Sequence, residues 1–241
     1  MKLNPDKTQL IVFGSRQNLK FLPPVSVTID NISINESNTV KNLGVIFDRH
    51  LSFDSHIDSL VRRCSGMLLS LCHAKHGLPA EVLPRLVDGL VMSSLRYCVS
   101  VYGATSGQLS QRIQKCINFC ARVLSGKRKY DHISDTLRSL GWLSAGQLHQ
   151  YYTLMALHRL TDSPEPEALA ALFVRNHDVH TRTTRARNQF HLPRIRNEHG
   201  RRRFAYRAAS LMNALPSHVR DSDSSRKSFG NALKRHMLAT T

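Results

Sequence analysis

The chain has 241 residues, of which 41% are hydrophobic and 21% charged, so it can bury a core and is not expected to be disordered throughout. Lys and Arg number 34 against 17 Asp and Glu, a net charge of +17, which predicts a polyanionic partner because each neutralised phosphate releases counterions. Apolar runs long enough to span a membrane are lacking, and so is a secretory signal pattern. With five irregularly spaced Cys, these features predict free thiols and an intracellular protein of the nucleus, the cytoplasm or both.

The first 50 residues have the patterns of short strands. Residues 9–13 are an apolar run, and residues 25–29 and 32–34 alternate apolar with polar side chains around Asp30-Asn31, a typical hairpin turn. Residues 43–47 form another apolar run with the length of a buried strand. These patterns predict one small sheet, too small to be stable alone.

From Leu51 the hydrophobic period becomes helical. A helix is predicted over 54–77, capped by Ser52 or Asp54. A second helix should open at Pro79, and a third should end at Gly126. Short connections between them predict an antiparallel bundle. The inward residues predicted for the second helix are Val82, Leu83, Leu86, Val87, Leu90, Val91 and Leu95.

Residues 127–241 carry most of the charge. Residues 121–241 have 21 basic and 9 acidic side chains, and ten of these arginines lie between Arg175 and Arg207. Helical periodicity predicts helices around residues 133–140, 148–160, 204–215 and 229–237. Residues 175–203 have almost no periodic apolar residues, which predicts an extended or loop segment. The fold class expected is therefore α+β, mainly α.

Several segments resemble the reverse transcriptases of non-LTR retrotransposons of the LINE type, jockey-like elements in particular. LNPDKTQLIVFG (residues 3–14) is similar to the segment after the catalytic aspartates, and VKNLGVIFDRHLSFDSHI (residues 40–57) to the primer-grip strand that leads into the thumb. RKYDHISDTLRSLGWLSAGQL (residues 128–148) and residues 204–238 resemble the tail that follows the thumb. The four pieces occur in the family's order over nearly the whole chain.

The resemblance implies three parts: palm-edge strands at residues 1–50, a thumb-like helical bundle at 51–126, and a basic helical tail at 127–241. It also implies that the chain is a C-terminal fragment of an RNA-directed DNA polymerase. The intact family enzyme uses Mg²⁺ held by clustered carboxylates. This sequence has no Asp-Asp dipeptide, and Asp6, Asp30 and Asp48 are isolated acids. We therefore expect no cofactor in this chain and no polymerase activity from it alone.

RNA or an RNA–DNA hybrid is the expected partner, gripped by basic residues. Arginine suits this role because its guanidinium contacts phosphates in bidentate fashion and stacks on bases, while Phe190, Phe204, His180 and His191 could offer stacking surfaces. The alternatives for the arginine-rich stretch are a solvated face or a nuclear-import signal. The predicted nucleic-acid-binding residues are Gly44, Arg62, Arg63, Lys75, Lys127, Arg128, Lys129, Arg182, Arg185, Arg187, Arg194, Arg196, Arg201, Arg202 and Arg203.

Other chemistry has weaker signals. Cys72 with His76 and Cys116 with Cys120 have helical i, i+4 spacing and could supply four zinc ligands, but buried cysteine is more often apolar filler. Thr105 stands where a nucleophile elbow has Ser, and phosphate-loop, HExxH and dinucleotide motifs are missing. Two functional alternatives to nucleic-acid binding stay open: a relic without independent activity, and a host-recruited helical interaction module. The oligomeric state also stays open.

Overall fold

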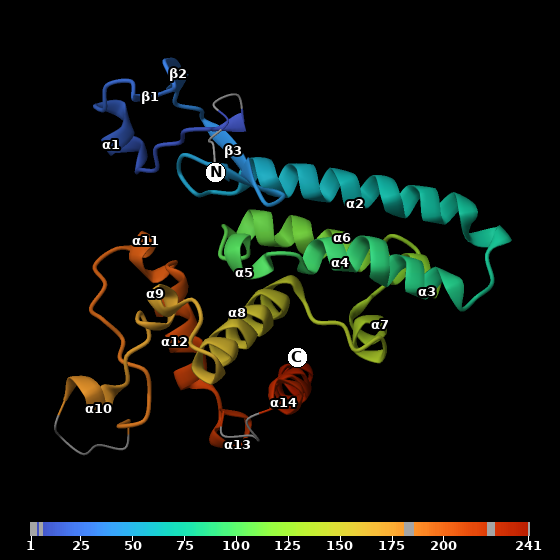
Figure 1. The fold of residues 1–241 in the computed structure, drawn as a ribbon. Coiled ribbons are helices and arrows are strands. Elements are labelled where there is room, and N and C mark those ends of the chain that lie inside the picture. Colours follow the sequence, from blue (N-terminus) through green and yellow to red (C-terminus); the bar gives the residue numbers. More distant parts are fainter. Residues whose placement is uncertain (1–3, 5–6, 181–185, 221–224, 241) are drawn as a thin grey trace. The chain divides into compact units, whose positions relative to one another are not determined.

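The computed structural model describes residues 4, 7–180, 186–220 and 225–240, and these residues form a mainly helical α+β structure with two small antiparallel sheets (Figure 1). The predicted fold class is thus confirmed at this level. The chain divides into two compact units, residues 1–95 with 105–116, and residues 96–104 with 117–241.

The first unit contains most of the elements that the sequence predicts, together with some that it does not predict. In chain order they are α1 (Arg16–Lys20), β1 (Ser26–Ile29), β2 (Ile32–Asn35), β3 (Thr39–Asn42), β4 (Val45–Asp48), α2 (Asp54–Ala74), the 3-10 helix η2 (Lys75–Gly77), α3 (Val82–Leu86), the π-helix η3 (Val87–Met92), α4 (Ser93–Arg96) and the first part of α6 (Gly107–Ser125).

The regular elements described in the second unit are helices, beside one isolated β-bridge between Arg175 and Phe190. The unit holds the remainder of α6 together with α5 (Val99–Tyr102), α7 (Ser134–Ser139), α8 (Ala145–Asp162), α9 (Glu167–Ala170), α10 (Asn176–Val179), α11 (Glu198–Arg201), α12 (Phe204–Ala214), α13 (Ser217–Arg220) and α14 (Arg226–Ala239).

The strand region differs from the single sheet predicted. Strands β1 and β2 pair through a turn at Asp30-Asn31, as predicted, with φ of 48° and 63°. Strands β3 and β4 form a separate pair, and Leu43-Gly44 is the turn between them rather than part of a strand. Gly44 has φ of 84°, so its role here is to close a hairpin.

The predicted strand over residues 9–13 is wrong. Only Leu10 pairs, in an isolated bridge with Glu36, and the Ser37 N–H donates to the Leu10 carbonyl at 2.8 Å. A longer strand needs a partner edge, and the rest of this run finds none among the described residues. The chain then enters α1, which the sequence analysis missed although Ser15 caps it through the Asn18 N–H.

Helix α2 begins where predicted but is capped differently. Its N-cap is Phe53, in the left-handed region at φ 61°, and the residue's side chain makes no capping hydrogen bond. Neither Ser52 nor Asp54 occupies that position. Instead the Asp48 carboxylate, at the end of β4, accepts hydrogen bonds from the loop that leads into the helix. The buried face of α2 contains His56, Ile57, Leu60, Cys64, Leu68 and Leu71.

The second predicted helix contains a π-helical segment that changes which side chains face inward. It begins at Val82 rather than Pro79, with Pro84 tolerated in the first turn. The i→i+5 pattern of η3 rotates the following residues, so Met92 is buried and the predicted Leu90 is 46% exposed. Val87, Val91 and Leu95 are buried as predicted.

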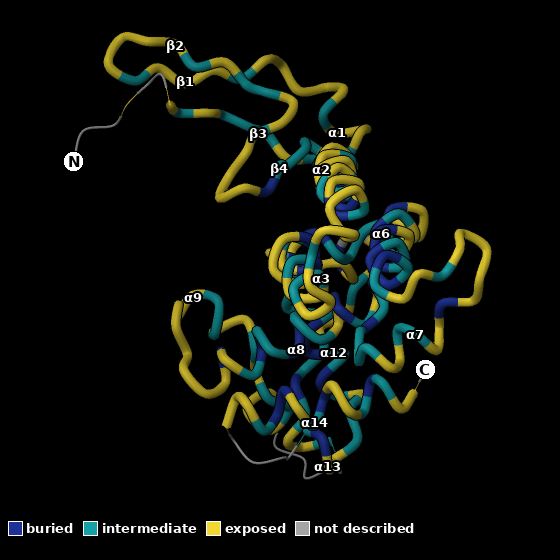
Figure 2. Tube along the Cα trace, turned by 90° about the vertical axis from the view of Figure 1, so that its right-hand side faces the viewer, coloured by how far each residue is buried: buried dark blue, intermediate teal, exposed yellow. Residues whose placement is uncertain are grey.

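Helix α8 is the centre of the second unit. Packed against it are α5, α12 and α14, and Figure 2 shows buried residues along it. Its start is a capping box, in which Ser144 accepts from the Gln147 N–H and the Gln147 side chain accepts from the Ser144 N–H. The same Gln147 amide donates to the Met237 carbonyl at 2.7 Å, which joins α8 to α14.

Candidate functional site

The arginine-rich segment, predicted to be extended or loop, contains two short helices that were not predicted. They are α10 and α11, and a bridge also joins Arg175 to Phe190. Hydrogen bonds from Asn176 N–H to the Gln189 carbonyl (3.0 Å) and from His191 N–H to the Val174 carbonyl (2.8 Å) hold the two ends of this loop together. The periodic pattern failed here because these helices have only four residues each, too short for a repeat to register.

Phe190 anchors the loop and is not available for stacking on bases. It is 3% exposed, its ring meets Phe173 edge-on at 5.9 Å, and the Asn213 amide bonds both its N–H and its carbonyl. The Arg175 guanidinium lies 4.0 Å from the Phe190 ring centroid. The predicted stacking role of Phe190 is therefore wrong, because the apolar ring is needed in the core.

Two arginines of the segment serve the structure. Arg175 is half-buried and donates to the Asn188 carbonyl at 2.6 Å, and burial, together with the charge of Arg220, lowers its pKa. Arg207 donates to the Ser100 carbonyl at 2.8 Å and to the Arg202 carbonyl at 2.9 Å. Burial lowers the pKa of Arg207 to about 10. Both guanidinium groups therefore donate hydrogen bonds to backbone carbonyl oxygens of the chain itself.

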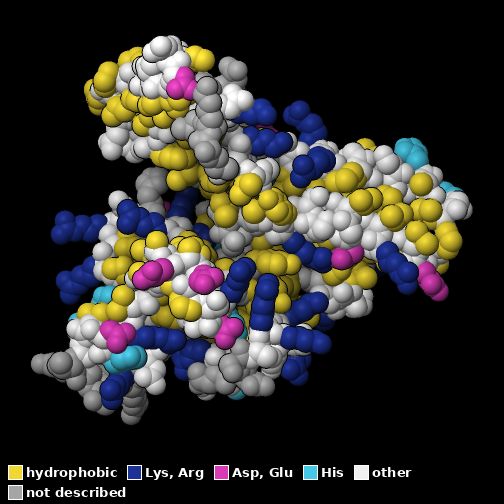
Figure 3. All heavy atoms as spheres, viewed as in Figure 1, with side chains coloured by type: hydrophobic (Ala, Val, Ile, Leu, Met, Phe, Trp, Pro, Cys, Tyr) yellow, Lys and Arg dark blue, Asp and Glu magenta, His cyan; other side chains and the backbone are white. Residues whose placement is uncertain are grey.

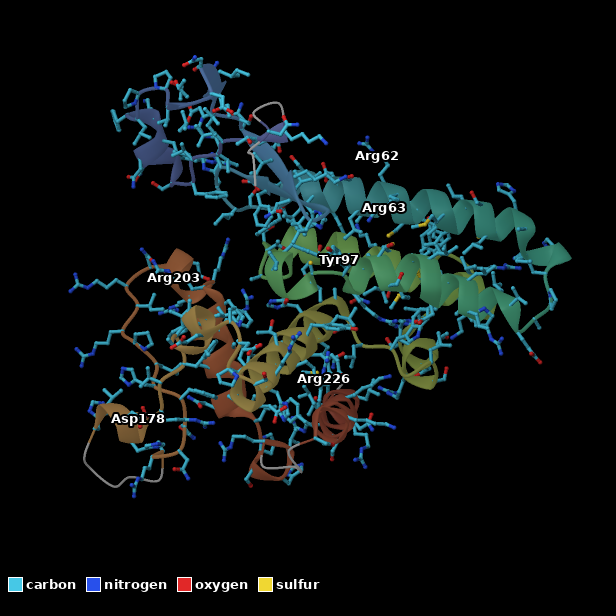
Figure 4. All side chains as sticks on the ribbon, in the orientation of Figure 1. Arg62, Arg63, Tyr97, Asp178, Arg203 and Arg226 are labelled. Atoms are coloured by element: carbon cyan, nitrogen blue, oxygen red, sulfur yellow. The ribbon has the colours of Figure 1, made fainter. Side chains whose placement is uncertain are left out.

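The remaining described arginines of the segment are exposed, and they form what we call the arginine surface: Arg187, Arg194, Arg196, Arg201, Arg202 and Arg203. Among the described residues the one acidic side chain that forms an ion pair with them is Glu198, 4.0 Å from Arg202. Figure 3 shows dark blue side chains projecting along this part of the second unit, and Figure 4 labels Arg203 beside α11. Arg182 and Arg185 lie outside the described residues.

The predicted contacts of the first unit are spread out. Arg62 and Arg63 are exposed neighbours on α2 (Figure 4), and Lys75 is exposed in η2, about 20 Å further along the helix axis at 1.5 Å per residue. Gly44 is in the turn between β3 and β4. The structure brings Arg62 and Arg63 together but not Lys75.

The cluster at 127–129 is partly engaged by its own loop. The Lys127 ammonium donates to the His132 carbonyl at 3.0 Å, and the Arg128 N–H donates to the Asp131 carboxylate at 2.7 Å. Lys129 lies 5.5 Å from the exposed Tyr130 ring. Arg128 and Lys129 keep exposed charges, whereas Lys127 is held in place.

The described acids do not suit the paired magnesium ions of the family enzyme. Asp48 accepts from the N–H groups of His50 (3.0 Å), Ser52 (3.1 Å) and Phe53 (2.6 Å). Burial acts to raise the Asp48 pKa, but these hydrogen bonds outweigh it and the pKa is lowered. Asp30 is an exposed turn residue, and Asp6 lies outside the described residues. The described part of the chain has no group of three His, Cys, Asp or Glu placed to hold a metal.

The cysteines are free thiols, and the contacts between them differ from those expected of the predicted zinc ligands. Cys64, which is not one of those ligands, is fully buried and shares a side-chain hydrogen bond with Cys116, which raises the Cys64 pKa well above its usual range. Cys120 is buried, while Cys72 is partly exposed. The buried thiols of Cys64, Cys116 and Cys120 contribute apolar packing, which was the alternative to zinc binding.

A buried histidine was missed by the sequence analysis. His149 on α8 is 7% exposed, and its Nε2 has no hydrogen-bond partner among the described residues. Burial, with the charge of Arg207, lowers its pKa to about 4. A Cβ at Gly103 would lie 2.5 Å from His149 Cδ2, so this position requires glycine. The inward helical position of His149, next to Leu148 and four residues before Thr153, could have indicated its burial.

Comparisons of the chain with protein-family models, with curated proteins and with solved structures find no match. Among the described helices, none has both the length and the apolar character needed to cross a bilayer.

Proposed function

We propose that this chain binds single-stranded RNA or an RNA–DNA hybrid through the arginine surface, as the non-catalytic C-terminal part of a non-LTR retrotransposon reverse transcriptase. In this proposal residues 1–50 correspond to the palm edge, 51–126 to the thumb and 127–241 to the tail. From the first unit, Arg62 and Arg63 would contribute a second contact, and Gly44 and Lys75 would contribute separate contacts.

The observation that carries the proposal is the set of six exposed arginines. Among the described residues, one acidic side chain, Glu198, forms an ion pair with any of them. Phosphate oxygens are the natural partners of such guanidinium groups because charge-assisted, bidentate hydrogen bonds form with them. The half-buried Arg175 and Arg207 support the same proposal indirectly. They fix the loop that displays the exposed arginines, so those arginines do not have to order the backbone on binding.

The test replaces Arg201, Arg202 and Arg203 together with Ala. For a single strand, the slope of log affinity against log salt is about 0.7 for every phosphate that the protein neutralises, so the triple variant should have a slope shallower by about 2. Fluorescence anisotropy of a labelled oligoribonucleotide over a salt series measures it.

The matched control replaces Lys227, Lys234 and Arg235 of α14 with Ala, which removes the same charge from exposed positions of the same unit. The slope of log affinity against log salt should be nearly the same in the control variant as in the unaltered chain. An unchanged slope in the first variant, or equal losses in both, contradicts the assignment of the arginine surface. Lack of RNA binding by the original chain favours the relic or the interaction module.

A further inference from the structure

The second unit contains a cavity of about 380 Å³, within the size range of small-molecule sites. Its walls come from α5, α8, α12, α14, Arg96 at the end of α4, and α9 with the segment before it, and all the lining residues lie within that unit. The arginine surface does not contribute to its lining. The cavity is therefore a second candidate site, separate from the one proposed above.

The charge around the cavity is positive. Arg96, Arg159 and Arg226 line it, against the single carboxylate of Glu165. Arg159 and Arg226 are exposed enough to reach a ligand, and Arg226 is labelled at the start of α14 in Figure 4. Three guanidinium groups around one cavity favour an anion with several oxygen acceptors, such as a phosphate.

The other walls are aromatic and apolar. Tyr152 and Phe204 line the cavity together with aliphatic side chains of α5 and α8. Tyr152 is held edge-on by Tyr151 at 5.3 Å, and Phe204 by Phe173 at 5.8 Å. Rings fixed in this way can accept a planar group without losing much side-chain entropy.

We propose that this cavity binds one nucleotide unit, with the phosphate at Arg159 and Arg226 and the base against Tyr152 and Phe204. The shared ligand chemistry is a nucleoside monophosphate, supplied free or as one nucleotide of an RNA strand. Phe204 follows Arg203 directly in the chain, so a strand on the arginine surface has a short path to the cavity. The site goes beyond the proposed function because it would retain a nucleotide even if the arginine surface bound no RNA.

Cys98 provides the readout, because its partly exposed thiol lines the cavity. The full chain is treated with N-ethylmaleimide, and mass spectrometry follows alkylation of Cys98 in the presence of adenosine 5′-monophosphate, adenosine, inorganic phosphate or a twelve-nucleotide RNA. We expect the monophosphate or the RNA to slow Cys98 alkylation at least fivefold, and adenosine or phosphate alone to slow it less. Cys72, on α2 in the first unit, is the internal reference whose rate should not change.

The pattern of protection identifies the source of the nucleotide. Protection by RNA at concentrations where the monophosphate has little effect indicates a nucleotide within a strand, and protection by the monophosphate alone indicates a free one. If neither slows alkylation at saturation, the proposal is overturned. Anisotropy measured in parallel separates this failure from that of the arginine surface, because RNA could still bind with its full salt slope.

A paired variant tests the arginines. Arg159→Ala with Arg226→Ala should raise the ligand concentration for half-maximal protection of Cys98 at least tenfold. The control, Lys227→Ala with Arg235→Ala, removes two charges outside the cavity lining and should leave it unchanged. Full protection in the first variant overturns the assignment of the phosphate to Arg159 and Arg226.

Discussion

His149 and Arg207 place a neutral imidazole and a guanidinium in the same buried part of the second unit. The Arg207 charge acts on His149 and disfavours a second positive charge there. The two terminal nitrogens of Arg207 donate to carbonyl oxygens, whereas Arg207 Nε and His149 Nε2 have no hydrogen-bond partner among the described residues. Protonation of His149 would therefore bury a charge without compensation.

This arrangement predicts a loss of stability in mild acid. Because folding lowers the His149 pKa from 6.5 to about 4, its contribution is present above 6.5 and declines as the pH falls toward 4. Between about pH 7.5 and pH 5 the chain should lose about 2 kcal/mol of unfolding free energy through this residue. Urea denaturation at the two pH values measures the loss.

The control is His149→Leu, which removes the titrating group and keeps an apolar side chain of similar size. Its pH-dependent loss should be smaller by that amount. A residual loss is expected, since burial also lowers the pKa of His56 and of His158. Equal pH dependence in both proteins would exclude His149 as a source.

At the scale of elements, the loop between β4 and α2 depends on one carboxylate. Asp48 accepts three backbone N–H groups, and the loop contains two non-glycine residues in the left-handed region, Leu51 (φ 52°) and Phe53 (φ 61°). Such conformations persist when surrounding contacts fix them. Phe53 is also held by Phe47, edge-on at 5.7 Å, and the Ile46 N–H donates to His56 Nδ1 at 3.4 Å.

Replacing Asp48 with Ala should destabilise the first unit by about 2–3 kcal/mol, because three N–H donors lose their acceptor. Asp48→Asn retains one carbonyl oxygen and should cost about 1 kcal/mol. Chemical denaturation measures both differences.

Glu81→Ala is the comparison for removal of a carboxylate, since Glu81 is exposed and does not cap α3 through its side chain. Its effect should stay within about 0.5 kcal/mol. If Asp48→Ala has an equally small effect, the loop is held by packing of Phe47 and Phe53 rather than by the carboxylate.

At the scale of the whole molecule, the net charge of +17 favours long-range attraction to polyanions, and in the proposed function the exposed arginines set how many phosphates are contacted. If all six residues of the arginine surface contact phosphates of a single strand, the salt slope should be about −4. Affinity should then fall about 300-fold between about 50 and 200 mM salt.

A salt series with the unaltered chain and a single-stranded oligoribonucleotide measures this slope. A slope of about −1 or shallower would mean that the arginine surface does not follow the RNA backbone. A slope much steeper than about −4 would indicate further contacts, for which Arg62 and Arg63 are the first candidates.

The sequence by itself determined the long helices, the hairpin turn at Asp30-Asn31 and the excess of positive charge. Hydrophobic period, turn residues and composition are local properties, and they predict local structure when the segment is long. Tertiary structure alone decided which of the arginines are exposed: Arg175 and Arg207 donate to carbonyl oxygens and are partly buried, whereas Arg201–Arg203 are exposed. Tertiary structure also left a single bridge where a strand was predicted at residues 9–13. It placed Arg159, Arg226 and Tyr152 around one cavity. These outcomes depend on partners distant in the chain, which no local pattern specifies.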